Sequence, residues 1–425
     1  MSQALTRIRP IIRDHFKKFR KREFIPGKTR IPLTVPTYDA AEVEETLESL
    51  LSTWVTMGRK VKRFEEMFAK YLGSKHAVMV NSGSSANLLA MSVLTNSMIQ
   101  KTMQPDSEVI TPAVTWVTTV YPIVNTGCLP VLVDVDLESY NISPDAIERA
   151  ITSKTKAIVP VHLLGNPCKI DGIKKIAGEK DLFVMEDACE SIGADFRGTK
   201  VGTFGDMGTF SFYMSHHIST IEGGMVVTDD DAMFECLKAM RAFGWVRDLA
   251  NAKRYAEENR AIDPRFLFLT QGFNFRPTEI QGAFGMHQIG KLERFIKLRR
   301  RNASYWNKRL ASYRDVLVLP REEPETRHVY FGYPVTVGAE AGFGRDDLTS
   351  DLEKRGIETR PIMAGNFADQ PVAKQIPCRV VGDLKNSRLI MRNSFFFGNH
   401  NGIGPAEREY VADSMIQFLD SAVRR

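Results

Sequence analysis

Short apolar runs alternate with amphipathic helical patterns from residue 76 onward. The runs are "HAVMV", "EVIT", "LPVLVDV", "KAIVPVHL" and "LFVMEDA", and a segment with helical spacing follows each of the first four. Buried parallel strands read as continuous apolar runs, and the helices between them cover both faces of the sheet. The pattern therefore predicts βα units and an α/β fold.

The second half of the chain follows a different pattern. Further strands are predicted at three apolar runs without long helices between them, residues 207–213, 224–230 and 266–273. A long helical pattern rich in Arg and Lys, residues 277–310, then opens on a proline, which is favoured at the first helical position. A mixed α+β pattern follows and ends with a helix near residues 405–422. These elements predict a smaller C-terminal α+β domain.

Charge is spread unevenly along the chain. The formal net charge is +6, but residues 1–30 alone hold ten Lys/Arg against two Asp/Glu. Such an arm could touch a membrane surface, a nucleic acid or an anionic ligand; no nucleic-acid motif accompanies it, so a solvated extension is the simpler interpretation. We therefore expect three segments: a basic extension over 1–30, a large domain over 31–276, and a linking helix with the small domain over 277–425.

Cysteines and hydropathy indicate where the protein works. The five cysteines lie far apart, without a CxxC pair or a Cys/His cluster at metal-ligand spacing. They predict free thiols in a reducing compartment and no metal site. No apolar run approaches the roughly 18 residues that span a bilayer, and the N-terminus lacks the apolar core of a signal peptide. We expect a cytoplasmic protein without a membrane span.

Residues at three predicted strand ends suit a planar, phosphorylated ligand. Gly83, Ser84 and Ser85 open a helix, whose free N–H groups favour phosphate. Asp187 ends the fifth run, at the edge of the sheet where α/β folds bind ligands. Trp116 follows the second run, where an indole could stack on a planar ring. Helix capping or core packing explains each residue taken alone, but their occurrence on three strand ends favours one ligand site.

Six segments, in order, connect the chain to a known family. They are "VMVNSGSSANL", "ITPAVTWVTTVYPIVNTG", "IVPVHLLGNPCKIDGI", "EDACESIGADFRGTKVGTFGDMGTFSFY", "IEGGMVVT" and "GFNFRPTEIQGAFGMHQI". With them, residues 31–420 resemble the DegT family of pyridoxal-phosphate (PLP) sugar aminotransferases. The resemblance implies the aspartate aminotransferase type I fold, with a mixed, mostly parallel sheet between helices in a large PLP-binding domain.

The resemblance also implies which residues bind the cofactor. They are Gly83, Ser84, Ser85, Trp116, Asp187, Glu190, Ser211 and Asn274. The serines would hold the phosphate, the tryptophan would stack on the pyridine ring, and the aspartate would pair with the ring nitrogen. Glu190, where the aminotransferases usually have glutamine, would lie near the ring hydroxyl. Asn274 would reach the phosphate from the other subunit, so a homodimer with shared active sites is implied.

One position departs from the family pattern. Counted from Ser211, the lysine that binds PLP covalently falls at His216, and no lysine lies between Lys200 and Lys238. An imidazole can transfer a proton near neutral pH but cannot anchor the cofactor covalently. His216 is therefore the candidate catalytic acid/base. His217 is interpreted as a neighbour without a chemical role.

A lysine-to-histidine change marks the sugar 3-dehydratases of this family, and residues 355–371 resemble that subgroup too. One branch holds a [2Fe–2S] cluster with closely spaced cysteines, but only Cys236 and Cys378 follow His216, so no iron–sulfur cluster is expected. The cluster-free branch implies a cycle in deoxysugar and O-antigen biosynthesis. L-glutamate would convert PLP to pyridoxamine phosphate (PMP), and a nucleotide-linked 4-keto-6-deoxy sugar, by resemblance GDP-4-keto-6-deoxymannose, would lose its C3 hydroxyl with release of ammonia.

Three further residues are candidates for substrate binding. The guanidinium groups of Arg247 and Arg276 suit phosphate and sugar oxygens, and Glu358 suits a sugar hydroxyl; a structural salt bridge explains each equally well. Two other functions stay open: a sugar 4-aminotransferase that works without lysine, and a catalytically inactive PLP-binding relative. The missing lysine argues against the first, and the intact set of cofactor residues argues against the second.

Overall fold

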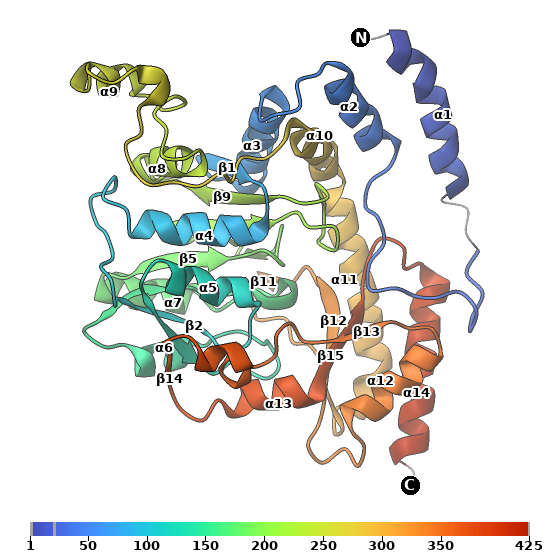
Figure 1. The fold of residues 1–425 in the computed structure, drawn as a ribbon. Helices are drawn as coiled ribbons and strands as arrows, with labels where there is room; N and C mark the ends of the chain where they lie inside the picture. Colours follow the sequence, from blue (N-terminus) through green and yellow to red (C-terminus); the bar gives the residue numbers. More distant parts are fainter. Residues whose placement is uncertain (1–2, 20–22, 424–425) are drawn as a thin grey trace.

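A computed structural model describes residues 3–19 and 23–423, with an eight-stranded sheet at its centre (Figure 1). Its strand order is β1-β9-β8-β5-β4-β2-β3-β14. The strands are β1 (His76–Val80), β2 (Glu108–Pro112), β3 (Leu129–Val133), β4 (Thr155–Ile158), β5 (Phe183–Asp187), β8 (Met207–Ser211), β9 (Gly224–Thr228) and β14 (Arg379–Val380). β9 is antiparallel to β1 and β8, whereas all pairs from β8 to β14 are parallel. The predicted mixed, mostly parallel α/β sheet is confirmed.

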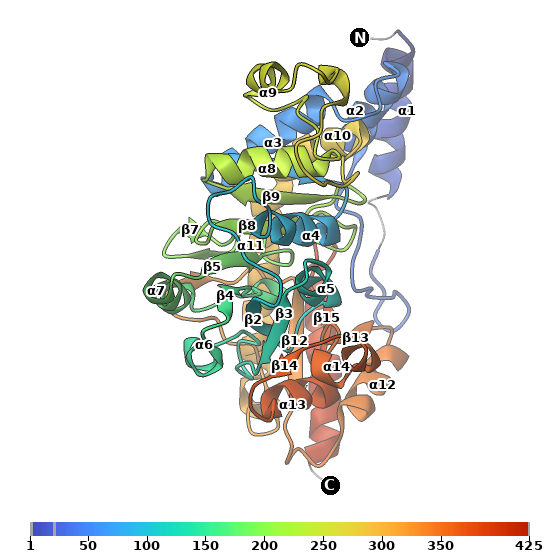
Figure 2. The ribbon, with the colours of Figure 1, turned by 60° about the vertical axis from the view of Figure 1, so that its left-hand side comes forward.

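Helices cover both faces of this sheet (Figure 2). One face packs against α4 (Gly83–Leu94), α5 (Val117–Asn125) and α8 (Asp231–Arg241). The other packs against α3 (Arg59–Leu72), α6 (Pro144–Ala150), α7 (Ile170–Lys180) and α11 (Leu292–Arg309). Within β1 the side chains alternate: Val78 and Val80 join the first core, and Ala77 and Met79 join the second. Burial on both faces is the reason that these strands read as unbroken apolar runs.

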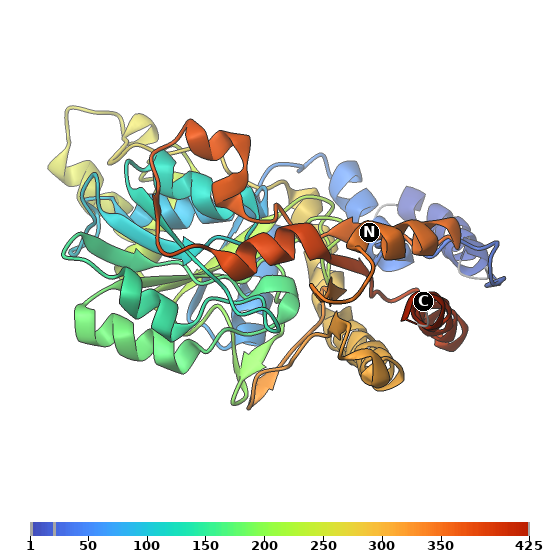
Figure 3. The same ribbon diagram turned by 90° about the horizontal axis from the view of Figure 1, so that it is seen from below.

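A second, antiparallel sheet in the order β10-β12-β15-β13 forms the smaller part, seen from below in Figure 3. Its strands are β10 (Leu317–Val318), β12 (Gly332–Val337), β13 (Thr359–Pro361) and β15 (Ser394–Gly398), and its helices are α12 (Arg345–Lys354), α13 (Lys385–Asn393) and α14 (Pro405–Val423). Trp306 of α11 lies in its core, with ring centroids 5.1 Å from Tyr333 and 4.9 Å from Phe397. The helix predicted near residues 405–422 is confirmed as α14. A short sheet, β11 (Thr326–Arg327), β6 (Asp195–Phe196) and β7 (Thr199–Lys200), joins the two parts.

Two sequence expectations differ from the structure. Residues 266–273 form no strand, because their N–H groups bond to the end of α8 and the loop after it: Leu269 donates to the carbonyl of Gly244, and Phe273 donates to that of Met240. The long helix is divided into α10 (Glu279–Gln288) and α11 by a 3₁₀ turn over Ile289–Lys291.

Most of the basic N-terminal arm is a helix, α1 (Gln3–Phe19), that packs on α2 (Ala40–Leu51). Leu5 is fully buried there, and Arg13 binds Glu44 at 2.7 Å. The basic residues 20–22 lie outside the described residues. The division of the chain at residue 277 stays a prediction. One strand beyond that residue, β14, belongs to the large sheet. None of the described helices is long and apolar enough to cross a membrane.

Candidate active site

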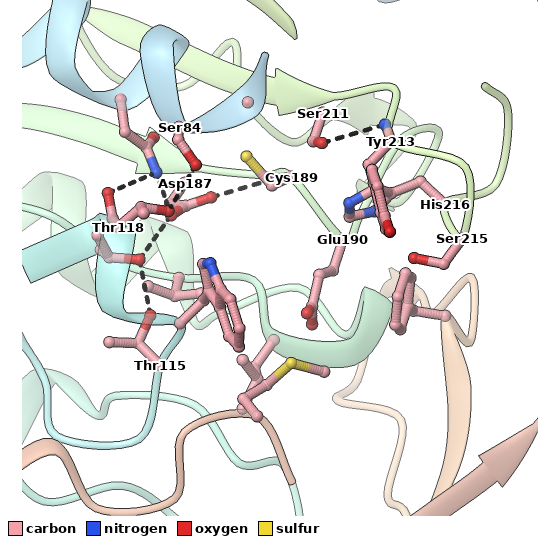
Figure 4. A pocket seen from close by; sticks show the side chains of 18 of the residues that line it. Ser84, Thr115, Thr118, Asp187, Cys189, Glu190, Ser211, Tyr213, Ser215 and His216 are labelled. Carbon is pink, nitrogen blue, oxygen red and sulfur yellow. Dashed lines mark hydrogen bonds between the residues drawn. The ribbon is translucent and has the colours of Figure 1, made fainter. Parts of the chain in front are cut away.

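A cavity of about 480 Å³ opens where the central strands end (Figure 4). Seven of the predicted site residues line it: Gly83, Ser84, Trp116, Asp187, Glu190, Ser211 and His216. They come from the start of α4, the turn before α5, the end of β5 and the end of β8. Because parallel strands present their carboxyl ends at one edge, residues far apart in the sequence meet here.

The start of α4 forms one end of the cavity. Ser82 caps the helix by accepting a hydrogen bond from the N–H of Ser85, and the two hydroxyls lie 3.0 Å apart. The Ser85 hydroxyl therefore serves the cap, and this residue does not line the cavity. Ser84 instead turns its hydroxyl toward Thr118, at 3.3 Å. The helix start, with the hydroxyls of Ser84 and Ser211, suits a phosphate group.

Asp187 lies at the floor of the cavity and is 5% exposed. Its Oδ2 accepts hydrogen bonds from Asn87 at 2.9 Å and Thr119 at 2.8 Å, and its Oδ1 accepts one from the N–H of Cys189 at 3.2 Å. These three donors hold the carboxyl group in one orientation. An oriented carboxylate at this depth can pair with a protonated ring nitrogen.

Trp116 supplies an apolar wall. Its side chain is 54% exposed although it lies in the cavity, and no aromatic partner stacks on it among the described residues. An indole of this size is usually buried in a core, so its open face suits a planar ligand. Val161 and Leu163 also line the cavity and add apolar surface.

His216 lies on the opposite wall, in the loop after β8. Its ring lies 5.1 Å from that of Phe331 and 6.4 Å from that of Tyr213. Nδ1 is buried without a hydrogen-bond partner among the described residues, and the residue lines the cavity. Burial, and secondarily the positive charge of Arg299, lowers its pKa to about 3. The imidazole is therefore neutral at pH 7 and can accept a proton at Nε2.

His217 points away from the cavity. It is fully buried, and its Nε2 lies 3.1 Å from the carbonyl oxygen of Val329. Its ring thus anchors the loop to the segment before β12. This placement agrees with the interpretation of a neighbour without a chemical role.

Glu190 reaches into the cavity from the turn after β5 (Figure 4). Its Oε2 accepts a hydrogen bond from the N–H of Leu164 at 2.7 Å. Burial and the nearby charge of Asp187 raise its pKa to about 8, although the Leu164 N–H acts in the opposite direction. It is therefore a neutral carboxyl near pH 7.

Besides Ser85, four further predicted residues lie outside the cavity wall. Arg276 donates to Asn274 at 3.0 Å and lies over the ring of Phe243, while Arg247 lies over that of Trp245. Glu358 is nearer the cavity, because it accepts from the N–H of Leu33 and pairs with Arg360, and both of these residues line the cavity. The roles assigned to Asn274, Arg247, Arg276 and Glu358 stay predictions.

Sequence reasoning missed several residues of the site. Asn87 and Thr119 orient Asp187, and Arg360 and Glu222 line the cavity. One signal was present: Asn87 is one of only two polar residues in the apolar segment "ANLLAMSVL", and it lies one turn after Gly83.

These residues fit PLP, the cofactor that the sequence implies. The cavity joins a helix start with hydroxyl groups, an open indole and an oriented carboxylate, which match a phosphate, a flat ring and a protonated ring nitrogen. None of the described residues that line it is a lysine.

Comparisons with known proteins agree with this arrangement. Residues 36–416 match the DegT/DnrJ/EryC1/StrS aminotransferase family. The chain is 40% identical over 372 residues to the GDP-4-keto-6-deoxy-D-mannose 3-dehydratase of Escherichia coli O55:H7, across 87% of this chain and 95% of that protein. Two crystal structures of GDP-4-keto-6-deoxymannose-3-dehydratase match at a TM-score of 0.85 and 39% identity, over 91% of this chain and 100% of theirs. One is a histidine-to-asparagine variant with bound GDP-perosamine, and the other holds a trapped PLP-glutamate geminal diamine.

Proposed function

The chain belongs to the DegT/DnrJ/EryC1/StrS aminotransferase family, and from this premise we propose that it is a PLP-dependent sugar 3-dehydratase. The observation that carries the proposal is the cavity wall itself, where His216 stands and where no described residue is a lysine. An amine-forming enzyme needs a lysine to hold the cofactor between turnovers. Here the cofactor would be held by noncovalent contacts alone.

The substrate is a nucleotide-linked 4-keto-6-deoxy sugar, for which GDP-4-keto-6-deoxymannose is the candidate named by the relatives. In its amine form the bound cofactor would supply a removable methylene proton and, once that proton is taken, the electron pair that expels the C3 hydroxyl. L-glutamate is the amino donor, and ammonia leaves with the 3-deoxy product.

The chain's own residues prepare this chemistry. Asp187, held by Asn87 and Thr119, keeps the ring nitrogen protonated, and Trp116 orients the ring. Nε2 of His216 takes up a proton and returns it, which a neutral imidazole can do without a further charged partner. Phe331, beside His216, keeps that wall apolar and limits the access of water.

A homodimer is part of the proposal. Apolar side chains remain exposed at and beside the cavity mouth, with Tyr213 and Met214 each 47% exposed and Ile221 52% exposed. Exposed apolar surface beside a ligand site is typical of an interface. A second copy of the chain would cover it and would bring Asn274 to the phosphate.

A cytoplasmic location also stays a prediction.

One assay tests the function. The purified protein is incubated with PLP, L-glutamate and GDP-4-keto-6-deoxymannose, and the sugar product is identified by mass spectrometry and NMR. Loss of the C3 oxygen with release of ammonia supports the dehydratase. A 4-amino sugar would instead identify an aminotransferase, and binding of PLP without turnover of any 4-keto nucleotide sugar would identify an inactive relative.

A variant tests the role of His216. We expect His216→Asn to bind the cofactor but to lose dehydration by at least about a hundredfold, the usual contribution of a general acid/base. His217→Gln is the matched control, because a glutamine amide can still donate to the carbonyl of Val329, and it should keep its activity. Wild-type turnover by His216→Asn would rule out the assigned role.

A further inference from the structure

Two carboxyl groups face the same cavity in unlike surroundings. Asp187 accepts three hydrogen bonds, which hold its carboxyl group in place. Glu190 accepts one, from the N–H of Leu164 to Oε2, and no donor is in place for Oε1 among the described residues. A carboxyl group that accepts few hydrogen bonds beside another carboxyl holds its proton more tightly than one that accepts several.

No cation offsets the charge that Glu190 would carry. The titratable and charged groups that line the cavity with it are Asp187, Cys189, Tyr213, His216, Glu222 and Arg360. His216 is neutral at pH 7, and Arg360 is the one positive group in this set. The guanidinium of Arg360 is paired with Glu358 at 3.2 Å, and no described residue forms a salt bridge with Glu190.

The backbone that binds Glu190 is unusual. Leu164 has φ +54°, a left-handed conformation that is uncommon for a leucine. Leu164 is the middle residue of the turn Leu163–Gly165, and its N–H points at the carboxyl group of Glu190. The turn fixes Oε2, so Oε1 is the oxygen free to serve a ligand.

We propose that Glu190 is a neutral hydrogen-bond donor to the ring oxygen of bound PLP, with its proton on the free carboxyl oxygen. This inference rests on the proposed cofactor. The aminotransferases usually have glutamine at this position, and a glutamine amide donates a hydrogen bond at any pH. A protonated carboxyl has the same shape and one donor, but it loses that donor when it ionises.

A limit on cofactor binding at alkaline pH follows. Because the pKa of Glu190 is raised to about 8, ionisation begins just above neutral pH. Above that value the donor becomes an anion facing the ring oxygen, beside Asp187. Binding must then take up a proton, so the affinity for PLP should fall by up to about tenfold per pH unit. No covalent bond to a lysine masks this loss.

The test measures dissociation constants for PLP, from its absorbance, between pH 6.5 and 9.5. We compare the wild type, Glu190→Gln and the control Glu222→Gln, which changes another carboxyl that lines the cavity. Glu190→Gln should bind PLP within about threefold of wild type at pH 7, because the amide replaces the donor, and should lack the alkaline loss. Glu222→Gln should keep the loss. If the affinity of Glu190→Gln for PLP falls at alkaline pH as it does in the wild type, the proposal is overturned.

A second readout does not depend on the cofactor. The infrared band of a protonated carboxyl should be present in the cofactor-free wild type at pH 7, vanish as the pH passes about 8, and be missing from Glu190→Gln. An ionised Glu190 at pH 7 would overturn the inference even if PLP binds. A wild type that shows this band but binds no PLP at any pH would refute the proposed function and, with it, the assigned partner of Glu190.

Discussion

Arg299 is a buried guanidinium behind the cavity wall that carries His216. It lies on α11, is 2% exposed and forms no salt bridge among the described residues. Its Nη1 donates to the main-chain carbonyls of Tyr330 at 3.2 Å, of Phe331 at 2.7 Å, and of Asn399. The ring of Phe331 lies against His216. Arg299 thus supports the wall that carries His216, the proposed acid/base, and its charge helps to keep that imidazole neutral.

Substitution of Arg299 tests this positioning role. We expect Arg299→Met to lower kcat about tenfold with a smaller change in KM, because the wall behind His216 shifts while the cavity mouth does not. The free energy of unfolding should fall by about 2–4 kcal/mol, since three buried carbonyls lose their donor. Arg299→Lys should recover part of kcat. Arg301→Met, an exposed change on the same helix, is the control, and a folded Arg299→Met with wild-type kcat would contradict the role.

At the residue scale, a site residue can be predicted from the sequence when it lies at a short, fixed spacing from another residue of the same motif. His216 could be placed because it lies five positions after Ser211 in a fixed pattern. Asn87 and Arg299 could not, since their partners lie 100 residues away or are main-chain carbonyls. A polar residue in a helical pattern shows no sign of such a partner until the fold brings the two together.

The contact between α4 and β8 sets the shape of the phosphate end. A Cβ atom on Gly83 would lie 2.5 Å from the Cβ and 3.2 Å from the Cα of Ser211. These distances are too short, and the Cα belongs to the backbone, so the helix start and the strand end would have to separate. Glycine is therefore required by the close approach of two elements.

We expect Gly83→Ala to weaken PLP binding by more than about tenfold, because both groups that are proposed to hold the phosphate, the start of α4 and Ser211, shift. The measurement is a PLP titration followed by absorbance. Gly178→Ala is the matched control: Gly178 lies in α7, and an added Cβ there meets no atom within 4 Å. It should bind PLP normally and be more stable by about 0.5–1 kcal/mol, the helix preference of alanine over glycine. Equal PLP affinity in the two variants would refute the packing argument.

At the element scale, strands of the parallel sheet were predictable because both of their faces are buried. The apolar run at 266–273 was wrongly predicted as a strand, because its N–H groups bond to the end of α8 and the loop after it rather than to a strand. The helical pattern at 277–310 likewise concealed the 3₁₀ turn at Ile289–Lys291. Both depend on contacts between elements, which periodicity does not contain.

Four histidines of the molecule have lowered pKa values, and three of them, His217, His328 and His400, are at most 2% exposed. Burial is the main cause that lowers the pKa of His216 and His328 to about 3 and of His400 to about 4, and it lowers that of His217 well below its ordinary value. Arg299 adds to this effect on three of them, all but His328. Nothing in the sequence sets these four apart from the chain's other histidines, because burial is a property of the fold.

These histidines predict acid lability. Between pH 6.5 and about 4 the unfolded chain binds four protons that the folded chain does not, so their contribution to stability is present above pH 6.5 and is lost as the pH falls. Glu190 acts in the opposite direction, because it is protonated in the folded state up to a pKa of about 8. Four protons less one leave about three, and the free energy of unfolding should fall by about 4 kcal/mol per pH unit near pH 5.5.

Urea unfolding at pH 7, 6 and 5 measures this slope. His217→Gln should reduce it by about a quarter to a third, and His287→Gln, which removes a histidine whose pKa is raised by Glu45, should steepen it. A free energy of unfolding that stays constant from pH 7 to pH 5 would mean that these four rings are not buried as neutral imidazoles.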